Sequence, residues 1–470
     1  MNKQIFNKFI AILMAFSLFL PYSARAATFN PNYIISDEEF TDYFSMELGD
    51  IQAFLGKGYL ADYKTVDIDG KTRYAADIIW RAAQRNGINP KVIMVMLQKE
   101  QSLITEDDPT EKQLDWALGY GVCDNCSLED PAIQRWRGLA KQINSATLQF
   151  TEGYLVDLAE NGQTVMGFAP GEACRIDGTT VVPANNATAA LYTYTPHLEG
   201  NENFSTIWQN WFSRNYPSGS LLQDSETGGV WLIQYGERRP ITSRAALLSR
   251  FNEAMIVAVS PTELGAYPQG NPISLPNYSL LQTEDGSIYL LVDDTIRNIV
   301  SMETFRSIGF IEDDLVSVTS GELAMYEVGD PITSDSVYPQ GALVQDTTSG
   351  GVYYVEDSVK YPIYSREILL ARFADKKIIS AGKGELETYD TGSPVEFADG
   401  SLVGVTGQPA VYLVSEGLRR PIASESVFLG FGYKWENVIW TNEKSVNLLS
   451  LGEALEEISF EDSQIETASQ

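Results

Sequence analysis

A fourfold repeat fills the second half of the chain and limits its possible folds more than any other sequence feature. A short segment with a central isoleucine recurs four times, and the isoleucines lie 58, 64 and 59 residues apart: Ile241, Ile299, Ile363 and Ile422. Each copy follows a run rich in β-branched and aromatic residues, which favour strands. The pattern predicts four β units, listed by approximate range as residues 219–277, 278–339, 340–399 and 400–456.

Tandem β units of this length expose strand edges that a stable fold must cover. Radial closure would cover them, so a four-bladed propeller-like region is the first expectation. A linear string of small β modules is the alternative. In both cases residues 217–456 are expected to be all-β.

Before the repeats, the hydrophobic spacing is helical. Helices are expected at residues 72–86, 132–160, from 185 or 186 to 192, and 204–211, with a long loop at 107–131. The turn-forming Pro217-Ser218-Gly219 marks the boundary with the repeats. We therefore expect a multidomain chain whose first domain, residues 27–216, is mainly α-helical.

The first 26 residues have the features of a secretory signal peptide. Lys3 and Lys8 precede an apolar run at residues 9–20, and Ala24-Arg25-Ala26 is a typical cleavage site. The mature chain is expected to start at Ala27, although an uncleaved N-terminal anchor is an alternative. No later stretch is apolar enough to span a membrane, so we expect a secreted or cell-envelope protein. The acidic residues 457–470 are expected to be disordered.

Charge and cysteine content limit the partners of this chain. The formal net charge of −30 argues against nucleic acid, because phosphate binding requires Lys and Arg. Export makes a disulfide the expected state of the cysteines, with Cys174 paired to Cys123 or Cys126. His197 is the single histidine, so a tetrahedral zinc site lacks ligands. Neither a metal nor a cofactor is expected.

The strongest candidate for chemistry lies in a predicted helix within residues 89–105. Pro90 suits the first turn of a helix, and nothing after it breaks one. Glu100 falls in the middle of an apolar arc that includes Met96 and Leu97. Burial there should raise the pKa of the carboxyl group, as a general acid requires. The alternative is that Glu100 closes the helix end, paired with an Arg or Lys.

Residues 50–212 resemble the lysozyme-like superfamily, in particular goose-type lysozymes and lytic transglycosylases. The similar segments are residues 97–103 around Glu100, 117–121 (Ala-Leu-Gly-Tyr-Gly) and 189–194 (Ala-Ala-Leu-Tyr-Thr-Tyr). The first segment has one extra residue between Glu100 and Ser102, and the third lacks the Asn and final Gly of the family motif. The resemblance implies that Glu100 is the general acid/base that cleaves the β-1,4 bond between N-acetylmuramic acid and N-acetylglucosamine.

The resemblance also suggests the surrounding residues. Tyr192 or Tyr194 would face Glu100, and a sugar-binding cleft would contain Gln101, Ser102, Trp116, Gly119 and Tyr120. Tyr192 and Tyr194 fit an ordinary core equally well, and Gln101 and Ser102 fit a solvent-facing helix end. A hydrolase needs a second carboxylate. The candidates are Asp107, Asp108, Asp115 and Asp124.

Two functions follow as hypotheses. The first is a secreted lytic transglycosylase or muramidase-type glycosidase that acts on peptidoglycan or another cell-wall glycan. The second is a non-catalytic surface protein that binds glycan, with repeats that form an adhesin-like or scaffold surface for a carbohydrate or protein partner. Glu100 beside Tyr192 or Tyr194 in a cleft would favour the enzyme. Glu100 turned into solvent, or capped by an Arg, would favour the binding protein.

Overall fold

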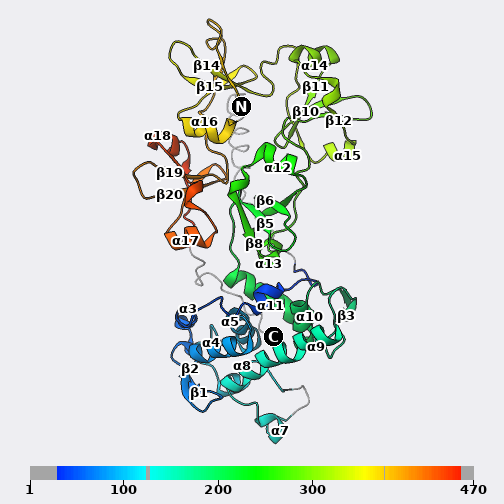
Figure 1. Cartoon of the computed structure of the whole chain (residues 1–470), viewed down its shortest axis with the longest axis vertical. Coiled ribbons are helices and arrows are strands. Elements are labelled where there is room, and N and C mark those ends of the chain that lie inside the picture. The colour runs from blue at the N-terminus through cyan, green and yellow to red at the C-terminus, as the bar shows by residue number, and fades with distance from the viewer. Residues whose placement is uncertain (1–28, 123–126, 375, 457–470) are drawn as a thin grey trace, which may run out of the picture.

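The computed structural model describes residues 29–122, 127–374 and 376–456. The predicted signal peptide, Cys123, Cys126, Asp124 and the acidic tail lie outside these ranges. A helical region occupies one end of the molecule, and four units rich in strands lie beyond it (Figure 1). Of the helices in the described ranges, none is long and apolar enough to cross a membrane.

The helical region contains short and long helices together with two hairpins. Its elements are α2 (Asp37–Thr41), α3 (Leu48–Phe54), η1 (Leu55–Lys57), η2 (Tyr59–Ala61), β1 (Lys64–Val66), β2 (Thr72–Tyr74), α4 (Ala75–Asn86), α5 (Pro90–Gln101), α6 (Glu111–Asp115), α7 (Pro131–Gln134), α8 (Leu139–Leu148), the π-helix η3 (Gln149–Leu155), α9 (Val156–Asn161), β3 (Cys174–Ile176), β4 (Thr179–Val181), α10 (Asn186–Tyr194) and α11 (Leu198–Phe212).

The ends of α5 are set by local chemistry. The Asn89 side chain accepts a hydrogen bond from the Lys91 N–H, and Pro90 occupies the first turn, where its missing N–H costs nothing. Ser102 ends the helix in a left-handed conformation, with φ of 56°. Its N–H caps the carbonyls of the last turn. The helix therefore stops one residue after Glu100, whose side chain lies at the edge of the core.

One continuous core holds the helical region together. It runs from Ile34 to Trp211, and residues 92–97 of α5 are buried within it. Helix α11 packs along α5, and α4 packs against both α5 and α8. Several expected boundaries differ: the helix expected at residues 132–160 is divided into α7, α8, η3 and α9, and the last helix begins at Leu198 instead of residue 204. Residues 72–74 form β2, so α4 begins at Ala75, and the expected loop at 107–131 contains α6.

Each repeat forms one small module of strands and short helices. Module 1 contains β5 (Leu221–Asp224), β6 (Val230–Gln234), β7 (Glu237–Ile241), α12 (Arg244–Arg250), η4 (Glu253–Met255), β8 (Ile256–Val259) and α13 (Pro261–Gly265). Module 2 contains β9 (Leu280–Gln282), β10 (Ile288–Val292), β11 (Thr295–Ile299), α14 (Met302–Ile308), η5 (Glu312–Asp314), β12 (Leu315–Ser317), α15 (Ser320–Leu323) and β13 (Glu327–Val328).

The remaining two modules repeat this order. Module 3 contains β14 (Ala342–Gln345), β15 (Val352–Glu356), β16 (Val359–Pro362), α16 (Arg366–Phe373), β17 (Ile378–Ser380) and β18 (Asp390–Thr391). Module 4 contains β19 (Leu402–Val405), β20 (Val411–Ser415), β21 (Leu418–Pro421), α17 (Glu425–Gly430), η6 (Trp435–Asn437), β22 (Ile439–Thr441), α18 (Glu443–Val446) and β23 (Ser450–Leu451).

The sheets overturn the expected fold class. In module 2 the strand order is β12-β9-β10-β11-β13, with antiparallel pairs in the centre and parallel pairs at both edges. A parallel pair needs a crossover connection, and the helix α14 lies in the connection from β11 to β12. Modules 3 and 4 have the same arrangement. The prediction of a mainly α domain followed by an all-β propeller is therefore wrong: the described repeats form small mixed sheets with helices, and they contain no closed barrel or propeller.

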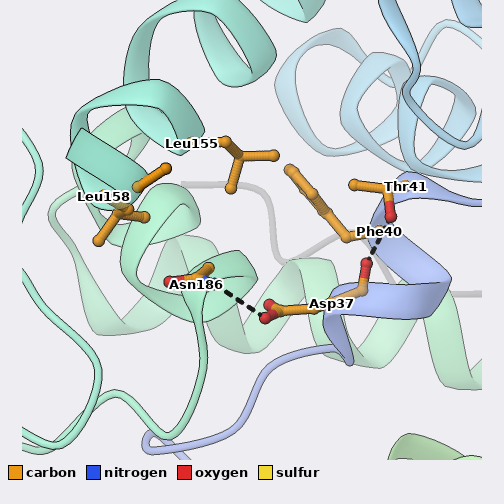
Figure 2. Close-up of a pocket in the computed structure, with 7 residues that line it drawn as sticks. Asp37, Phe40, Thr41, Leu155, Leu158 and Asn186 are labelled. Carbon is orange, nitrogen blue, oxygen red and sulfur yellow. Dashed lines mark hydrogen bonds between the residues drawn. The ribbon is translucent and has the colours of Figure 1, made fainter. Parts of the chain in front are cut away.

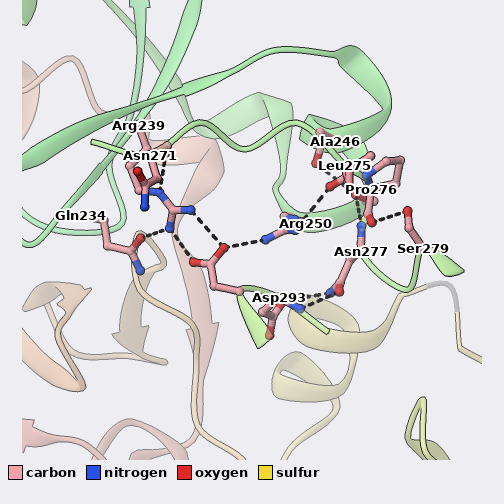
Figure 3. A network of polar contacts seen from close by, with 12 residues as sticks. Gln234, Arg239, Ala246, Arg250, Asn271, Leu275, Pro276, Asn277, Ser279 and Asp293 are labelled. Atoms are coloured by element: carbon pink, nitrogen blue, oxygen red, sulfur yellow. Dashed lines mark hydrogen bonds and ion pairs between the residues drawn. The ribbon is translucent and has the colours of Figure 1, made fainter. Parts of the chain in front are cut away.

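Neighbouring modules contact one another in two ways. Apolar residues of modules 1 and 4 share one core, which includes Leu222 and Leu413, and modules 3 and 4 share another. Modules 1 and 2 are joined by polar contacts around Arg239 and Arg250 (Figure 3). Both guanidinium groups bind the Asp294 carboxylate, Arg239 with two hydrogen bonds and Arg250 with one.

Module 1 is also joined to the helical region. Ser260 donates a hydrogen bond to Glu39 of α2 at 2.8 Å, and Thr262 accepts one from the backbone N–H of Ser36 at 3.2 Å. Glu263 of α13 lies 3.4 Å from Arg214, which comes two residues after the end of α11. The helical region therefore reaches the repeats through α2 and the residues after α11.

Candidate active site

A groove of about 590 Å³ opens on the helical region. It lies among the end of α5, the loop after α6, the end of α10 and the first turns of α11. The lining includes Lys99, Glu100, Leu118, Gly119, Tyr194, Thr195, His197, Glu199, Gly200 and Asn203. The groove thus brings together segments that are far apart in the sequence.

Glu100 has a cationic partner in this groove. Its side chain is 26% exposed, and its Oε1 lies 2.6 Å from the Lys99 Nζ. The Lys99 side chain is only 6% exposed, and its Nζ also donates a hydrogen bond to Thr195 Oγ1 at 2.8 Å. The purely apolar surroundings expected for Glu100 are therefore absent. Helical periodicity could not show this, because a long lysine side chain can fold back along an apolar surface.

Thr195 is itself held in place by close packing. A Cβ atom at Gly200 would lie 2.6 Å from Thr195 Cγ2, so only glycine lets α11 approach the threonine this closely. Thr195 follows α10, whereas Lys99 lies on α5. The Lys99 ammonium, and through it Glu100, is therefore positioned by contacts between α5, α10 and α11.

Tyr194 and Gly119 form another wall of the groove. The Tyr194 hydroxyl donates a hydrogen bond to the Leu118 carbonyl at 2.8 Å, and its ring stacks on Phe150. Burial, with a smaller contribution from the charge of Glu100, holds the pKa of Tyr194 well above its usual value. Gly119 has φ of 65°, and a Cβ there would lie 3.8 Å from Glu100 Oε2. Tyr194 thus fixes the loop that faces the carboxylate.

The other predicted site residues do not line the groove. The Tyr192 ring is buried, and its hydroxyl donates to the Pro31 carbonyl at 2.9 Å, away from Glu100. Trp116 is buried at the end of α6, and Tyr120 packs edge-on against Trp136.

Gln101 and Ser102 complete the end of α5. The Gln101 carbonyl accepts a hydrogen bond from the Gln113 side chain, and Ser102 is the helix cap. Neither residue is part of the groove lining. Both positions are explained by local helix structure.

The suggested second carboxylates also lie elsewhere. Asp115 is 2.7 Å from Arg137 in an ion pair, and Asp107 and Asp108 are exposed outside the groove. The groove instead contains Glu199, which the sequence analysis missed. Glu199 was missed because the start of α11 was placed too late in the chain. The segment before Phe204 is polar, contains a glycine and lacks hydrophobic periodicity. The sequence therefore predicted that the last helix begins at Phe204, whereas in the structure it begins at Leu198.

His197 lies at the rim of the groove with an acidic neighbour. Its Nδ1 is 3.0 Å from Asp177 Oδ1, and the other Asp177 oxygen accepts a hydrogen bond from the Leu198 N–H. That backbone hydrogen bond, followed by the one with His197, lowers the pKa of Asp177. Asp177 also lies in the turn between the antiparallel strands β3 and β4.

A smaller cavity of about 240 Å³ lies between α2, η3, α9 and α10 (Figure 2). Asp37 binds Asn186 at its polar end, at 3.1 Å. Phe40 lines it and packs edge-on against Phe150, which in turn stacks on Tyr194. A continuous aromatic contact therefore connects this cavity with the groove.

The structure describes one of the three cysteines. Cys174 is partly buried on β3, and its two predicted partners lie outside the described ranges. Within those ranges, no group of three or more His, Cys, Asp or Glu side chains is placed to hold a metal ion.

Comparisons with known proteins give two matches in sequence. A family model described as LasA, N-terminal domain, matches residues 33–218, which is less than half of the chain. Protein CgeD of Bacillus subtilis (strain 168) is 25% identical over 223 residues, which cover 44% of this chain and 50% of CgeD. The chain thus spans about half the length of the curated relative it matches.

Solved structures give weaker similarities. A periplasmic assembly from the ESX-5 inner membrane complex aligns at 15% identity and a TM-score of 0.13, over 52% of this chain and 68% of that chain. The EccB3 dimer from the ESX-3 core complex aligns at 12% identity and a TM-score of 0.13, over 50% of this chain and 98% of that chain. Scores this low carry no argument about the fold.

Proposed function

We propose that this chain is an exported enzyme that cleaves a cell-wall glycan, with peptidoglycan as the substrate and Glu100 as the general acid/base. The observation that carries the proposal is the position of Glu100 in a groove beside Gly119 and Tyr194. These residues come from the three segments that resemble lysozyme-like enzymes. Export is supported by the match to the LasA N-terminal domain and by the signal-like start of the chain.

Each groove residue has a distinct part in the proposed reaction. Protonated Glu100 donates its proton to the glycosidic oxygen as the bond to C1 of the muramic acid breaks. The Lys99 ammonium stabilises the carboxylate that remains. Tyr194 keeps the Leu118 and Gly119 backbone against the sugar.

A second candidate is a binding protein that holds glycan in the same groove without cleaving it. The specific observation in its favour is the 2.6 Å contact between Lys99 and Glu100, because the ammonium group occupies a carboxylate oxygen that a catalytic acid would present to the sugar. The exposed residues of the groove would then only contact the sugars.

The two candidates are separated by incubating residues 27–470 with purified peptidoglycan and measuring soluble fragments by mass spectrometry. Glu100→Gln removes the acid and should lower release by about 10²–10⁴-fold. Glu111→Gln, an exposed carboxylate on α6 outside the groove, is the matched control and should cleave like the original chain. If the folded chain binds glycan from several wall types but releases no soluble fragments from any of them, the enzyme proposal is wrong and the binding-protein proposal remains.

A further inference from the structure

The groove contains a second carboxylate that comes from a different helix than Glu100. Glu199 lies in the first turn of α11, and Asn203 follows one turn later on the same face. Both side chains are exposed and line the groove. Because α11 packs along α5, both carboxylates belong to one site.

The two carboxylates differ in their surroundings. Glu100 is paired with Lys99, whereas the Glu199 and Asn203 side chains have no hydrogen-bond or ion-pair partner among residues 29–122, 127–374 and 376–456. Acidic residues elsewhere in this region, such as Asp115 and Asp177, are held by Arg137 and His197. Glu199 is therefore available to water and to a ligand in the groove.

We propose that Glu199 is the base that activates water in the groove, so that cleavage is a hydrolysis with inversion at C1. This inference rests on the proposed function. The Glu199 carboxylate takes a proton from water as the water oxygen bonds to C1 of the muramic acid. The bond from C1 to the glycosidic oxygen breaks, and that oxygen takes the proton of Glu100. Proton exchange with solvent restores both carboxyl groups, so the net reaction adds one water.

A base fits Glu199 better than a nucleophile does. A nucleophile must be held against C1 by its neighbours, and no described residue orients Glu199. A base acts through an intervening water, for which inverting enzymes leave about 6.5–9.5 Å between their carboxyl groups. A groove of about 590 Å³ has room for sugar and water together. The Asn203 amide can donate to and accept from an acetamido group of the same sugar.

The test compares Glu199→Gln with Glu202→Gln in the mature chain, residues 27–470. Glu202 is an exposed carboxylate on the same helix but outside the groove lining, so it is the matched control. On purified peptidoglycan, Glu199→Gln should lower the rate of cleavage by about 10²–10⁴-fold, and Glu202→Gln should leave it unchanged. Unchanged thermal melting of both variants shows that folding is not the cause.

Two readouts separate a base from a structural residue. Azide should restore cleavage by Glu199→Ala and appear as an α-glycosyl azide, because the small anion replaces the activated water. In the unaltered chain, NMR of fresh products should show new reducing ends that are first formed as the α anomer. Ends of the 1,6-anhydro type, first-formed β ends, or full activity of Glu199→Gln would overturn the inference alone. Absence of cleavage by the unaltered chain would overturn the proposed function.

Discussion

The helical region and the modules reach stability in different ways. The helical region has one core that extends from Ile34 to Trp211. The modules have several small cores, and module 4 shares its apolar residues with modules 1 and 3. A unit of about sixty residues buries a smaller fraction of its surface than a larger domain. The modules therefore depend on their neighbours, whereas the helical region is complete in itself.

The contacts at the two ends of module 1 also differ in their electrostatics. Toward the helical region, burial raises the pKa of Glu263, and the charge of Arg214 offsets this only in part. Toward module 2, burial alone would raise the pKa of Asp294, but the hydrogen bond and charges of Arg239 and Arg250 lower it. A fall in pH should therefore increase the stability contributed by Glu263 at the contact with the helical region and decrease the stability contributed by Asp294 at the contact with module 2.

The largest expected effect comes from the core of the helical region. Phe150→Ala removes a side chain that is 2% exposed and should cost about 3–5 kcal/mol of unfolding free energy. Calorimetry should show a shift of the transition that belongs to this region. Phe305→Ala, in the core of module 2, should shift the transition of the modules instead. A single common transition that moves in both variants would mean that the two regions do not fold separately.

A smaller effect is expected at the contact between modules 1 and 2. Asp294→Asn leaves two guanidinium groups without their carboxylate and should cost about 1–3 kcal/mol, near the lower limit because Asp294 is partly exposed. The loss should appear in denaturant unfolding of the modules and shrink at high salt. Glu303→Gln, an exposed carboxylate on α14, is the control. Equal stability of the two variants would show that this network contributes nothing.

The contact between module 1 and α2 should be weaker still. Ser260→Ala removes the N-cap of α13 and a hydrogen bond to Glu39, which should cost about 1 kcal/mol. Hydrogen exchange in α13 should speed up while exchange in α5 stays slow. Ser225→Ala, at an exposed serine of module 1, should change neither rate. Faster exchange in α5 as well would contradict the independence of the helical core.

The smallest effect concerns pH. Because the folded chain raises the pKa of Glu263, its contribution to stability is full below the ordinary carboxyl pKa and is lost as pH rises through the higher folded value. Asp294 has the opposite sign, since its contribution is lost as pH falls through its lowered folded pKa. Glu263→Gln should flatten the decline in melting temperature between acidic and neutral pH. A steeper decline in the variant would show that the sign is wrong.

Much of the local structure could be predicted from the sequence. Pro90 and the apolar spacing that follows it predicted the helix that the structure shows as α5. The sheet topology could not be predicted, because a short β run does not reveal its partner: β12 pairs in parallel with β9, which lies far before it in the chain.

For the candidate site, too, some features could be predicted from the sequence and others could not. The sequence by itself placed Glu100 in a helix that starts near Pro90, and it showed that Tyr194 and Gly119 lie in segments similar to those of lysozyme-like enzymes. The tertiary structure decided that Lys99 pairs with Glu100, that Thr195 holds Lys99, and that Glu199 enters the same groove. The physical reason is distance along the chain. Helical periodicity relates residues three or four apart, whereas the contact of Lys99 with Thr195 spans 96 residues and depends on how α5, α10 and α11 pack.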